Sequence, residues 1–67
     1  MNRNMFIRQL PKEKQDAIRN ELISFYESTL KGIYSEEEIS NMIEDVMDDR
    51  IWVLEDGFSY LLDELNI

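Results

Sequence analysis

Apolar residues recur every three or four positions along much of this chain, which is the spacing of one face of an α-helix. The clearest stripe lies in residues 36–49 and consists of Ile39, Met42, Ile43, Val46 and Met47. A second stripe lies in residues 11–31 and consists of Ile18, Leu22, Phe25 and Thr29, with Tyr26 and Leu30 beside it. The opposite face of residues 36–49 is acidic, as expected for a helix with one buried side. The pattern predicts an all-α fold, a small bundle of two or three helices.

Signals for helix starts and stops agree with both ranges. Pro11 suits a first helical turn, because its missing N–H would have no partner there. Gly32 can adopt the left-handed conformation that commonly ends a helix. Ser35 and Glu38 form the S-x-x-E pattern of a capping box, in which each side chain bonds the backbone N–H of the other residue. We therefore expect one helix from Pro11 to Lys31 and a second that begins after Ser35.

Two structures compete for the last third of the chain. A heptad-like seam with steps of three and four predicts a helix through Met47, Ile51, Leu54, Phe58, Leu61 and Leu65. Asp56-Gly57 is instead a strong signal for a two-residue β-turn, and strand-forming residues lie on both sides of it. Because a glycine within a helix costs only about 1 kcal/mol relative to alanine, we favour the helix. The alternative is an α+β fold with a C-terminal hairpin at residues 51–62.

The length of the chain limits its domain structure and its stability. A chain of 67 residues forms one domain at most, and we assign residues 11–67 to a single helical domain. Residues 1–10 form a basic lead-in whose apolar side chains fit a frayed end, a half-turn or a short strand. A lone core of this size is marginal. With no cysteine and no histidine, neither a disulfide nor a Cys/His zinc site supports it, which leaves regular helix packing and self-association.

The charges of the chain divide by position. Residues 1–20 hold five bases and two acids, a net charge of +3, and residues 21–67 hold two bases and thirteen acids, a net charge of −11. Together they give the total of −8. The five N-terminal bases are Arg3, Arg8, Lys12, Lys14 and Arg19. Such a chain can pair its own ends, pair with a copy of itself or bind a positive partner, whereas nucleic acids and anionic lipids repel it.

The sequence lacks the motifs of catalysis and of cofactor or metal binding. The carboxylates of residues 36–56 do not follow the spacing of a calcium loop, and a carboxylate di-metal site usually adds histidine. Two glycines cannot build a phosphate-binding loop. The apolar run Ile51–Leu54 is far shorter than the ~20 residues of a membrane span. We therefore expect a cytoplasmic protein that is not an enzyme and has no catalytic residue, no cofactor, no metal and no contact with a membrane.

The opening of the chain resembles that of a group of small proteins. The similarity lies in Phe6-Ile7-Arg8-Gln9-Leu10-Pro11-Lys12-Glu13, together with Gln15 and Ile18. It is a resemblance to small bacterial and phage-borne helical proteins that have no assigned function. The resemblance implies a bacterial or mobile-element setting, and it brings no site residues with it.

The remaining hypothesis is a small protein–protein interaction module that self-associates as a dimer and regulates or inhibits a larger protein. The apolar candidates for partner binding are Trp52, Phe58, Tyr60 and Leu61, because aromatic side chains are enriched in interfaces. The acidic candidates, which would bind a basic protein surface, are Glu37, Glu44, Asp45, Asp48 and Asp49. Trp52 lies off the heptad seam, so we expect it to be exposed in the monomer and buried in a complex.

Two other functions fit the charge pattern. The same five carboxylates can imitate the phosphates of a nucleic acid and block the basic groove of a nucleic-acid enzyme. A DNA-binding repressor would instead use the basic N-terminal segment. The acidic body opposes contact with DNA, so direct binding of nucleic acid is the least favoured of the three functions.

Overall fold

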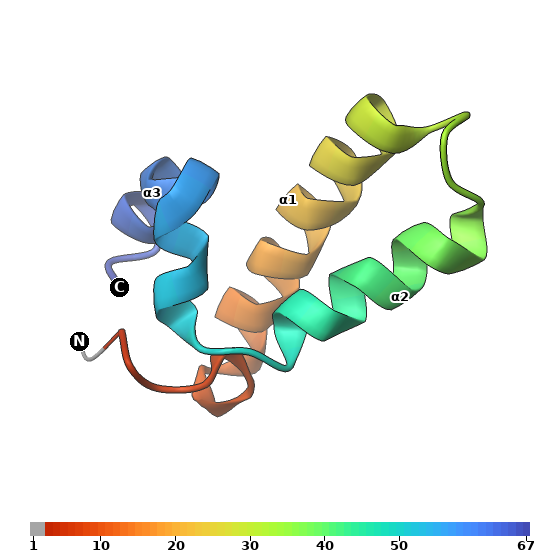
Figure 1. Ribbon diagram of the computed structural model, residues 1–67. Coiled ribbons are helices and arrows are strands. Elements are labelled where there is room, and N and C mark those ends of the chain that lie inside the picture. Colours follow the sequence, from red (N-terminus) through yellow and green to blue (C-terminus); the bar gives the residue numbers. More distant parts are fainter. Residues whose placement is uncertain (1–2) are drawn as a thin grey trace.

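The computed structural model describes residues 3–67 and confirms the all-α fold. The helices are α1 (Lys12–Leu30), α2 (Glu36–Met47) and α3 (Glu55–Glu64), and short 3₁₀ helices span Ile7–Gln9 and Ile51–Leu54. α1 and α2 form a hairpin whose helices lie closer together at the start of α1 than at their connection, and α3 packs beside α1 (Figure 1).

The hairpin of α1 and α2 has the boundaries that the sequence predicts. Gly32, two residues after α1, has a φ of +90°, the left-handed conformation. Ser35 caps α2, since its Oγ accepts a hydrogen bond from the Glu38 N–H at 3.1 Å. Glu38 Oε1 in turn accepts from the Ser35 N–H at 3.1 Å. The predicted capping box is confirmed.

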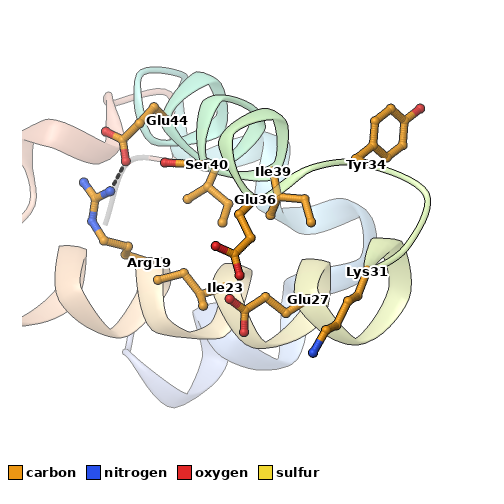
Figure 2. A pocket seen from close by; sticks show the side chains of 10 residues that line it. Arg19, Ile23, Glu27, Lys31, Tyr34, Glu36, Ile39, Ser40 and Glu44 are labelled. Carbon is orange, nitrogen blue, oxygen red and sulfur yellow. Dashed lines mark hydrogen bonds and ion pairs between the residues drawn. The ribbon is translucent and has the colours of Figure 1, made fainter.

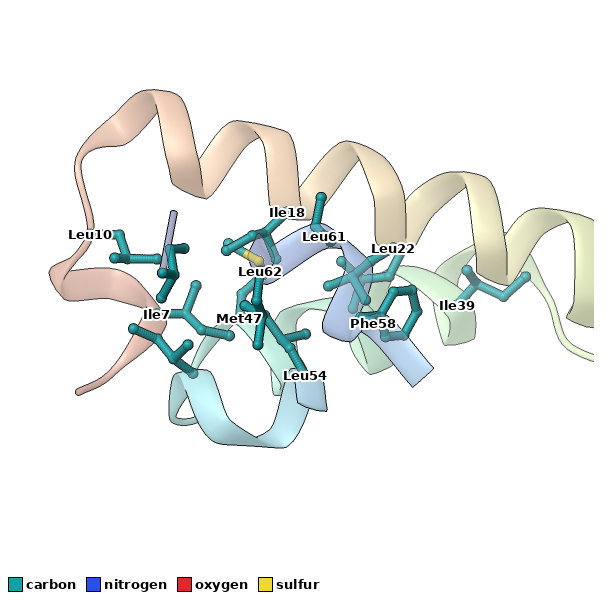
Figure 3. Close-up of a cluster of buried hydrophobic side chains, with 13 residues drawn as sticks. Ile7, Leu10, Ile18, Leu22, Ile39, Met47, Leu54, Phe58, Leu61 and Leu62 are labelled. Atoms are coloured by element: carbon teal, nitrogen blue, oxygen red, sulfur yellow. The ribbon is translucent and has the colours of Figure 1, made fainter. Parts of the chain in front are cut away.

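The core lies where the three helices and the N-terminal segment meet (Figure 3). Its fully enclosed side chains are Ile7, Ile18, Leu22, Met47, Ile51, Leu54 and Leu62. Phe25, predicted to continue the stripe of α1, is instead 46% exposed. Beyond this position α1 extends past α3 and diverges from α2, so its last turns have fewer neighbours (Figure 1). Ile39 accordingly lies at the far end of the cluster (Figure 3).

The N-terminal segment is built into the domain. Three backbone hydrogen bonds join it to the α2–α3 connection: Ile7 N–H to Asp49 O at 3.0 Å, Ile51 N–H to Met5 O at 2.9 Å and Trp52 N–H to Arg3 O at 2.9 Å. Of the three conformations that we considered for this segment, the structure combines a half-turn with a single antiparallel bridge, between Phe6 and Arg50. Because Ile7 and Leu10 are buried in the common core, packing continues across the expected boundary at residue 10.

Side chains also contribute to the contact between the N-terminal segment and the α2–α3 connection. The Arg50 guanidinium lies 4.4 Å from the centre of the Phe6 ring and donates to the Asn4 carbonyl at 2.6 Å. Arg3 reaches the other end of the chain, where it donates to the Ile67 carbonyl at 2.9 Å and pairs with Glu55 at 3.2 Å. The start of the described residues and the C-terminus therefore lie close together (Figure 1).

The last third of the chain is helical but kinked, so neither sequence-based alternative is right in full. The hairpin at residues 51–62 is wrong, because this range holds a 3₁₀ helix and most of α3. A continuous helix is also wrong, because Asp56, Gly57 and Phe58 have non-helical backbone angles and Gly57 has a φ of +96°. The kink turns the rest of α3, so that Leu62 is fully buried while Leu65, the expected seam residue, is only partly buried.

We predict that Ile7→Ala lowers the free energy of unfolding by about 3 kcal/mol, because it leaves a cavity beneath the N-terminal segment. Urea denaturation followed by circular dichroism measures this loss. Ile33→Ala is the matched control: Ile33 is 71% exposed, so the same change should cost less than about 0.5 kcal/mol. Equal stability of the two variants would mean that the N-terminal segment does not fold with the domain.

We predict that Gly57→Ala destabilises the protein by about 1–2 kcal/mol, because a left-handed backbone strains a residue with a Cβ. Nothing lies within 4 Å of the added methyl group, so the loss would come from the backbone alone. In a regular helix the same substitution would stabilise by about 1 kcal/mol. The sign of the change in a urea melt therefore tests the kink, and Ser59→Ala controls for helix propensity nearby.

Candidate functional site: an aspartate groove beside an aromatic row

The acidic residues at the C-terminal end of α2 and in the turn after it face two sides, and those on one side form ion pairs within the molecule. Arg8 Nη2 lies 2.9 Å from Glu44 Oε1, and Arg8 Nε lies 3.0 Å from Asp48 Oδ1. Arg19 of α1 forms an ion pair with the other oxygen of Glu44. The hydrogen bonds from Arg19 and Arg8 lower the pKa of Glu44. Two of the predicted acidic contacts, Glu44 and Asp48, thus face arginines of their own chain.

The other flank of α2 borders a groove of about 250 Å³ between α1, α2 and the start of α3. The apolar residues that line this groove are Leu22, Tyr26, Val46, Val53, Leu54 and Phe58. Its acidic residues are Asp45, Asp49 and Asp56. We call this cavity the aspartate groove. Its lining combines apolar side chains with carboxylates and contains no arginine or lysine.

The carboxylates of the aspartate groove have few partners within the chain. Asp49 Oδ1 accepts a hydrogen bond from the Arg50 backbone N–H at 2.7 Å. Among residues 3–67, no arginine or lysine forms an ion pair with Asp45, Asp49 or Asp56. Like charges that border one cavity without a counter-charge give it a negative potential, which attracts cations.

A row of four aromatic rings borders the aspartate groove. Phe25 lies 5.7 Å from Tyr26 and 5.2 Å from Phe58, and Phe58 lies 6.2 Å from Tyr60, measured between ring centres. We call these four residues the aromatic row. Phe58 is buried, whereas Phe25 and Tyr60 are 46% and 48% exposed. Because Tyr26 and Phe58 also line the groove, the row and the groove form one continuous surface.

Tyr60 is held in place at the end of the aromatic row. Its hydroxyl donates a hydrogen bond of 2.8 Å to the Glu21 carboxylate on α1. This hydrogen bond raises the pKa of Tyr60 above its ordinary value, because it stabilises the protonated phenol. The contact joins α3 to α1 and fixes the direction of an exposed ring, which reduces the entropy that a partner would lose by ordering it.

The structure brings together only some of the residues that the sequence singled out. Phe58, Asp45 and Asp49 meet in the aspartate groove. Leu61 is buried in the core, so it cannot contact a partner without rearrangement. Trp52 is 52% exposed but does not line the groove. Glu37 is exposed in the first turn of α2 and also lies outside the groove.

Sequence reasoning did not identify Val53 and Asp56, which line the groove on the side opposite α2. Asp56 comes to the border because the backbone turns at Gly57, and Val53 lines the groove from the 3₁₀ helix. The Asp-Gly pair signalled a sharp change of direction in the sequence. The sequence alone could not show that this turn lies opposite α2, because that position depends on tertiary packing.

A second cavity, of about 340 Å³, lies between α1 and α2 near their connection (Figure 2). Its apolar side chains are Ile23, Ile39 and Ile43. Its charges have both signs: the Arg19–Glu44 pair lies at one end, and the other charged residues are Glu27, Lys31 and Glu36. The Tyr34 ring points away from it (Figure 2). Mixed charges give this cavity no strong preference for a cationic or an anionic partner.

Two other kinds of site have no support in residues 3–67. No group of three or more acidic side chains there is placed to hold a metal ion. None of the helices combines the length and the apolar character that crossing a membrane requires. The aspartate groove and the aromatic row are therefore the surface from which we argue function.

We predict that Glu44→Gln removes a stabilising contribution that depends on pH. The pKa of folded Glu44 is lowered, so its ion pairs add stability above its ordinary pKa of 4.5, and this contribution is lost as the pH falls through the lowered value. The difference in free energy of unfolding between wild type and variant should be largest at neutral pH and vanish in strong acid. Urea denaturation across this pH range measures it.

Glu37→Gln is the matched control for this experiment, because Glu37 is exposed and forms none of these ion pairs. Its effect on stability should change less with pH than that of Glu44→Gln. High salt should reduce the Glu44 effect, because the side chain is 41% exposed and its ion pairs are screened. A Glu44→Gln effect that stays constant with pH would contradict the ion-pair assignment.

Comparison with known proteins identified no relative of this chain. No protein-family model, no curated protein and no solved structure matches the chain. The function is therefore argued from the charge, the exposure and the shape of the site itself.

Proposed function

We propose that this chain is a cytoplasmic protein–protein interaction module, without catalytic activity, that regulates or inhibits a larger protein by binding a basic surface on it. We further propose that two copies associate through the aromatic row. The observation that carries the proposal is the exposure of Phe25 and Tyr60, each close to half exposed although both rings lie beside the buried Phe58 ring.

The aromatic row has the character of an interface rather than of an ordinary surface. Aromatic side chains are enriched at protein interfaces, where each buries a large apolar area. A two-fold dimer places the same patch of both copies in contact, so one row can cover the other. The exposed parts of Phe25 and Tyr60 would then leave water, and the dimer would be stabilised by their burial.

The net charge of −8 opposes association of two copies, and it gives dimerisation and binding to a basic partner different dependences on salt. Two copies repel each other at low salt, so salt should strengthen the dimer by screening that repulsion. Binding to a basic surface is attractive, so salt should weaken it. The opposite salt dependences distinguish self-association from partner binding in one set of measurements.

The two nucleic-acid functions have less support. A phosphate mimic needs a row of free carboxylates, but Glu44 and Asp48 pair with Arg8, which leaves Glu37, Asp45 and Asp49 of the proposed set. A DNA-binding repressor needs free bases, but Arg3, Arg8 and Arg19 form ion pairs with acids of the same chain. Both alternatives therefore rank behind binding to protein.

We predict a concentration-dependent dimer that salt strengthens. Size-exclusion chromatography with light scattering should show a mass that rises from monomer towards dimer as concentration and salt increase. The double variant Phe25→Gln/Tyr60→Gln should weaken dimerisation at least tenfold, because it removes about half-exposed rings from the contact.

The control variant is Ile33→Gln, which removes an exposed apolar side chain of the α1–α2 connection that is not part of the aromatic row. It should dimerise as wild type does, and circular dichroism should show that every variant is folded. A wild-type mass that stays monomeric at all concentrations, or equal loss of the dimer in the control, would contradict the role of the aromatic row.

A further inference from the structure

We propose that the aspartate groove binds a basic amphipathic segment of the partner protein, with apolar side chains inserted into the groove and lysine or arginine side chains at its acidic border. This inference rests on the proposed function, because it gives the chemistry of the partner that the module recognises. It commits to an occupant from a different protein rather than from a second copy of this chain.

The size and the lining of the groove favour side chains over a small molecule. Its volume of about 250 Å³ is below the roughly 300–1,000 Å³ typical of small-molecule sites. Val46, Val53 and Phe58 present apolar surface to it from both walls. A groove of this kind receives one or two apolar side chains of a helix, as helix-in-groove complexes do.

The acidic residues stand on two walls of the groove, and this arrangement specifies the charge of the occupant. Asp45 lies in the last turn of α2 and Asp49 lies just after that helix ends, and both line the groove on this side. Asp56 approaches from the kink of α3. A segment with bases on both sides of an apolar ridge would therefore meet a carboxylate on each side. Arginine would bind best, because its guanidinium can hold one carboxylate through two hydrogen bonds.

A second copy of the chain does not offer such a segment. Arg3, Arg8 and Arg19 form ion pairs with acids of α2 and α3, and Lys12 pairs with Asp16 one turn further along α1. Each of these four bases would have to leave an existing partner before it could bind the groove of another copy. Arg50 already lies over the Phe6 ring and donates to the Asn4 carbonyl. The remaining bases, Lys14 and Lys31, lie at opposite ends of α1 and so do not form one basic segment. The total charge of −8 opposes that encounter further.

Nuclear magnetic resonance titration tests the proposal with a defined probe. The probe is a synthetic helical peptide of leucine and lysine, with leucine on one face, and its counterpart carries glutamate at every lysine position. We expect the lysine peptide to shift backbone amide signals of residues 45–49 and 53–58, and the glutamate peptide to shift none of them. Binding should weaken as salt increases.

A matched pair of variants separates the groove from the net charge. Asp45→Asn/Asp56→Asn should weaken binding of the lysine peptide roughly tenfold, since each partly exposed charge pair contributes a modest amount. Glu37→Gln/Glu64→Gln changes the net charge equally, but neither residue lines the groove, so it should weaken binding less than about twofold. Equal weakening by both variants would overturn the proposal.

Other outcomes would also contradict binding of a basic segment in the aspartate groove. Shifts spread over the whole surface, shifts confined to the cavity between α1 and α2, or equal binding of the glutamate peptide would each overturn the inference. The Phe25→Gln/Tyr60→Gln variant should not dimerise through the aromatic row, so shifts of its Asp45 and Asp49 amides on raising the protein concentration without peptide would assign the groove to a second copy and overturn the proposal. The Phe25→Gln/Tyr60→Gln variant should still bind the lysine peptide, so loss of the dimer and loss of groove binding can be told apart.

Discussion

The backbone hydrogen bonds between residues 3–7 and residues 49–52 are the constraint on which the rest of the structure depends. They hold Ile7 beneath the α2–α3 connection and satisfy backbone groups that lie outside any helix. The same bonds set the course of the chain as it leaves α2. That course places the 3₁₀ helix and the kink of α3 opposite α2, and so it creates the aspartate groove.

The charge division seen along the sequence becomes a division around α2. Successive residues of a helix point about 100° apart, so neighbouring acids can face different surroundings. Glu44 and Asp48 turn towards Arg8, which holds the N-terminal segment against the helix. Asp45 and Asp49 turn towards the groove, where no base of the chain forms an ion pair with them. The acids at the end of α2 and in the turn after it thus form internal ion pairs on one side and leave negative charge available on the other.

Local signals predicted local structure well. The capping box at Ser35, the left-handed Gly32 and the stripe of α2 are all present, because each depends on residues close in sequence. The burial of Ile7 and the exposure of Phe25 could not be predicted, because both depend on which distant segment packs alongside.

The structure of the C-terminal third could be predicted only in part. Asp56-Gly57 predicted a hairpin, which is wrong, although Gly57 does adopt the left-handed backbone typical of turns. The heptad seam predicted a helix, which is present but interrupted at this position. The candidate site was predictable to a similar extent. Asp45, Asp49 and Phe58 carry chemistry that the sequence displays, whereas the wall formed by Val53 and Asp56 exists only after the chain has folded back.

The contact between the two ends of the chain also sets the order in which the protein can form. Helical proteins dominated by local contacts fold quickly, while pairings between distant segments require a long loop to close first. During synthesis the α1–α2 hairpin is made before the 3₁₀ helix and α3 that complete its core. A nascent chain therefore carries an uncovered apolar stripe until its last third is released, and only then can Ile7 be enclosed.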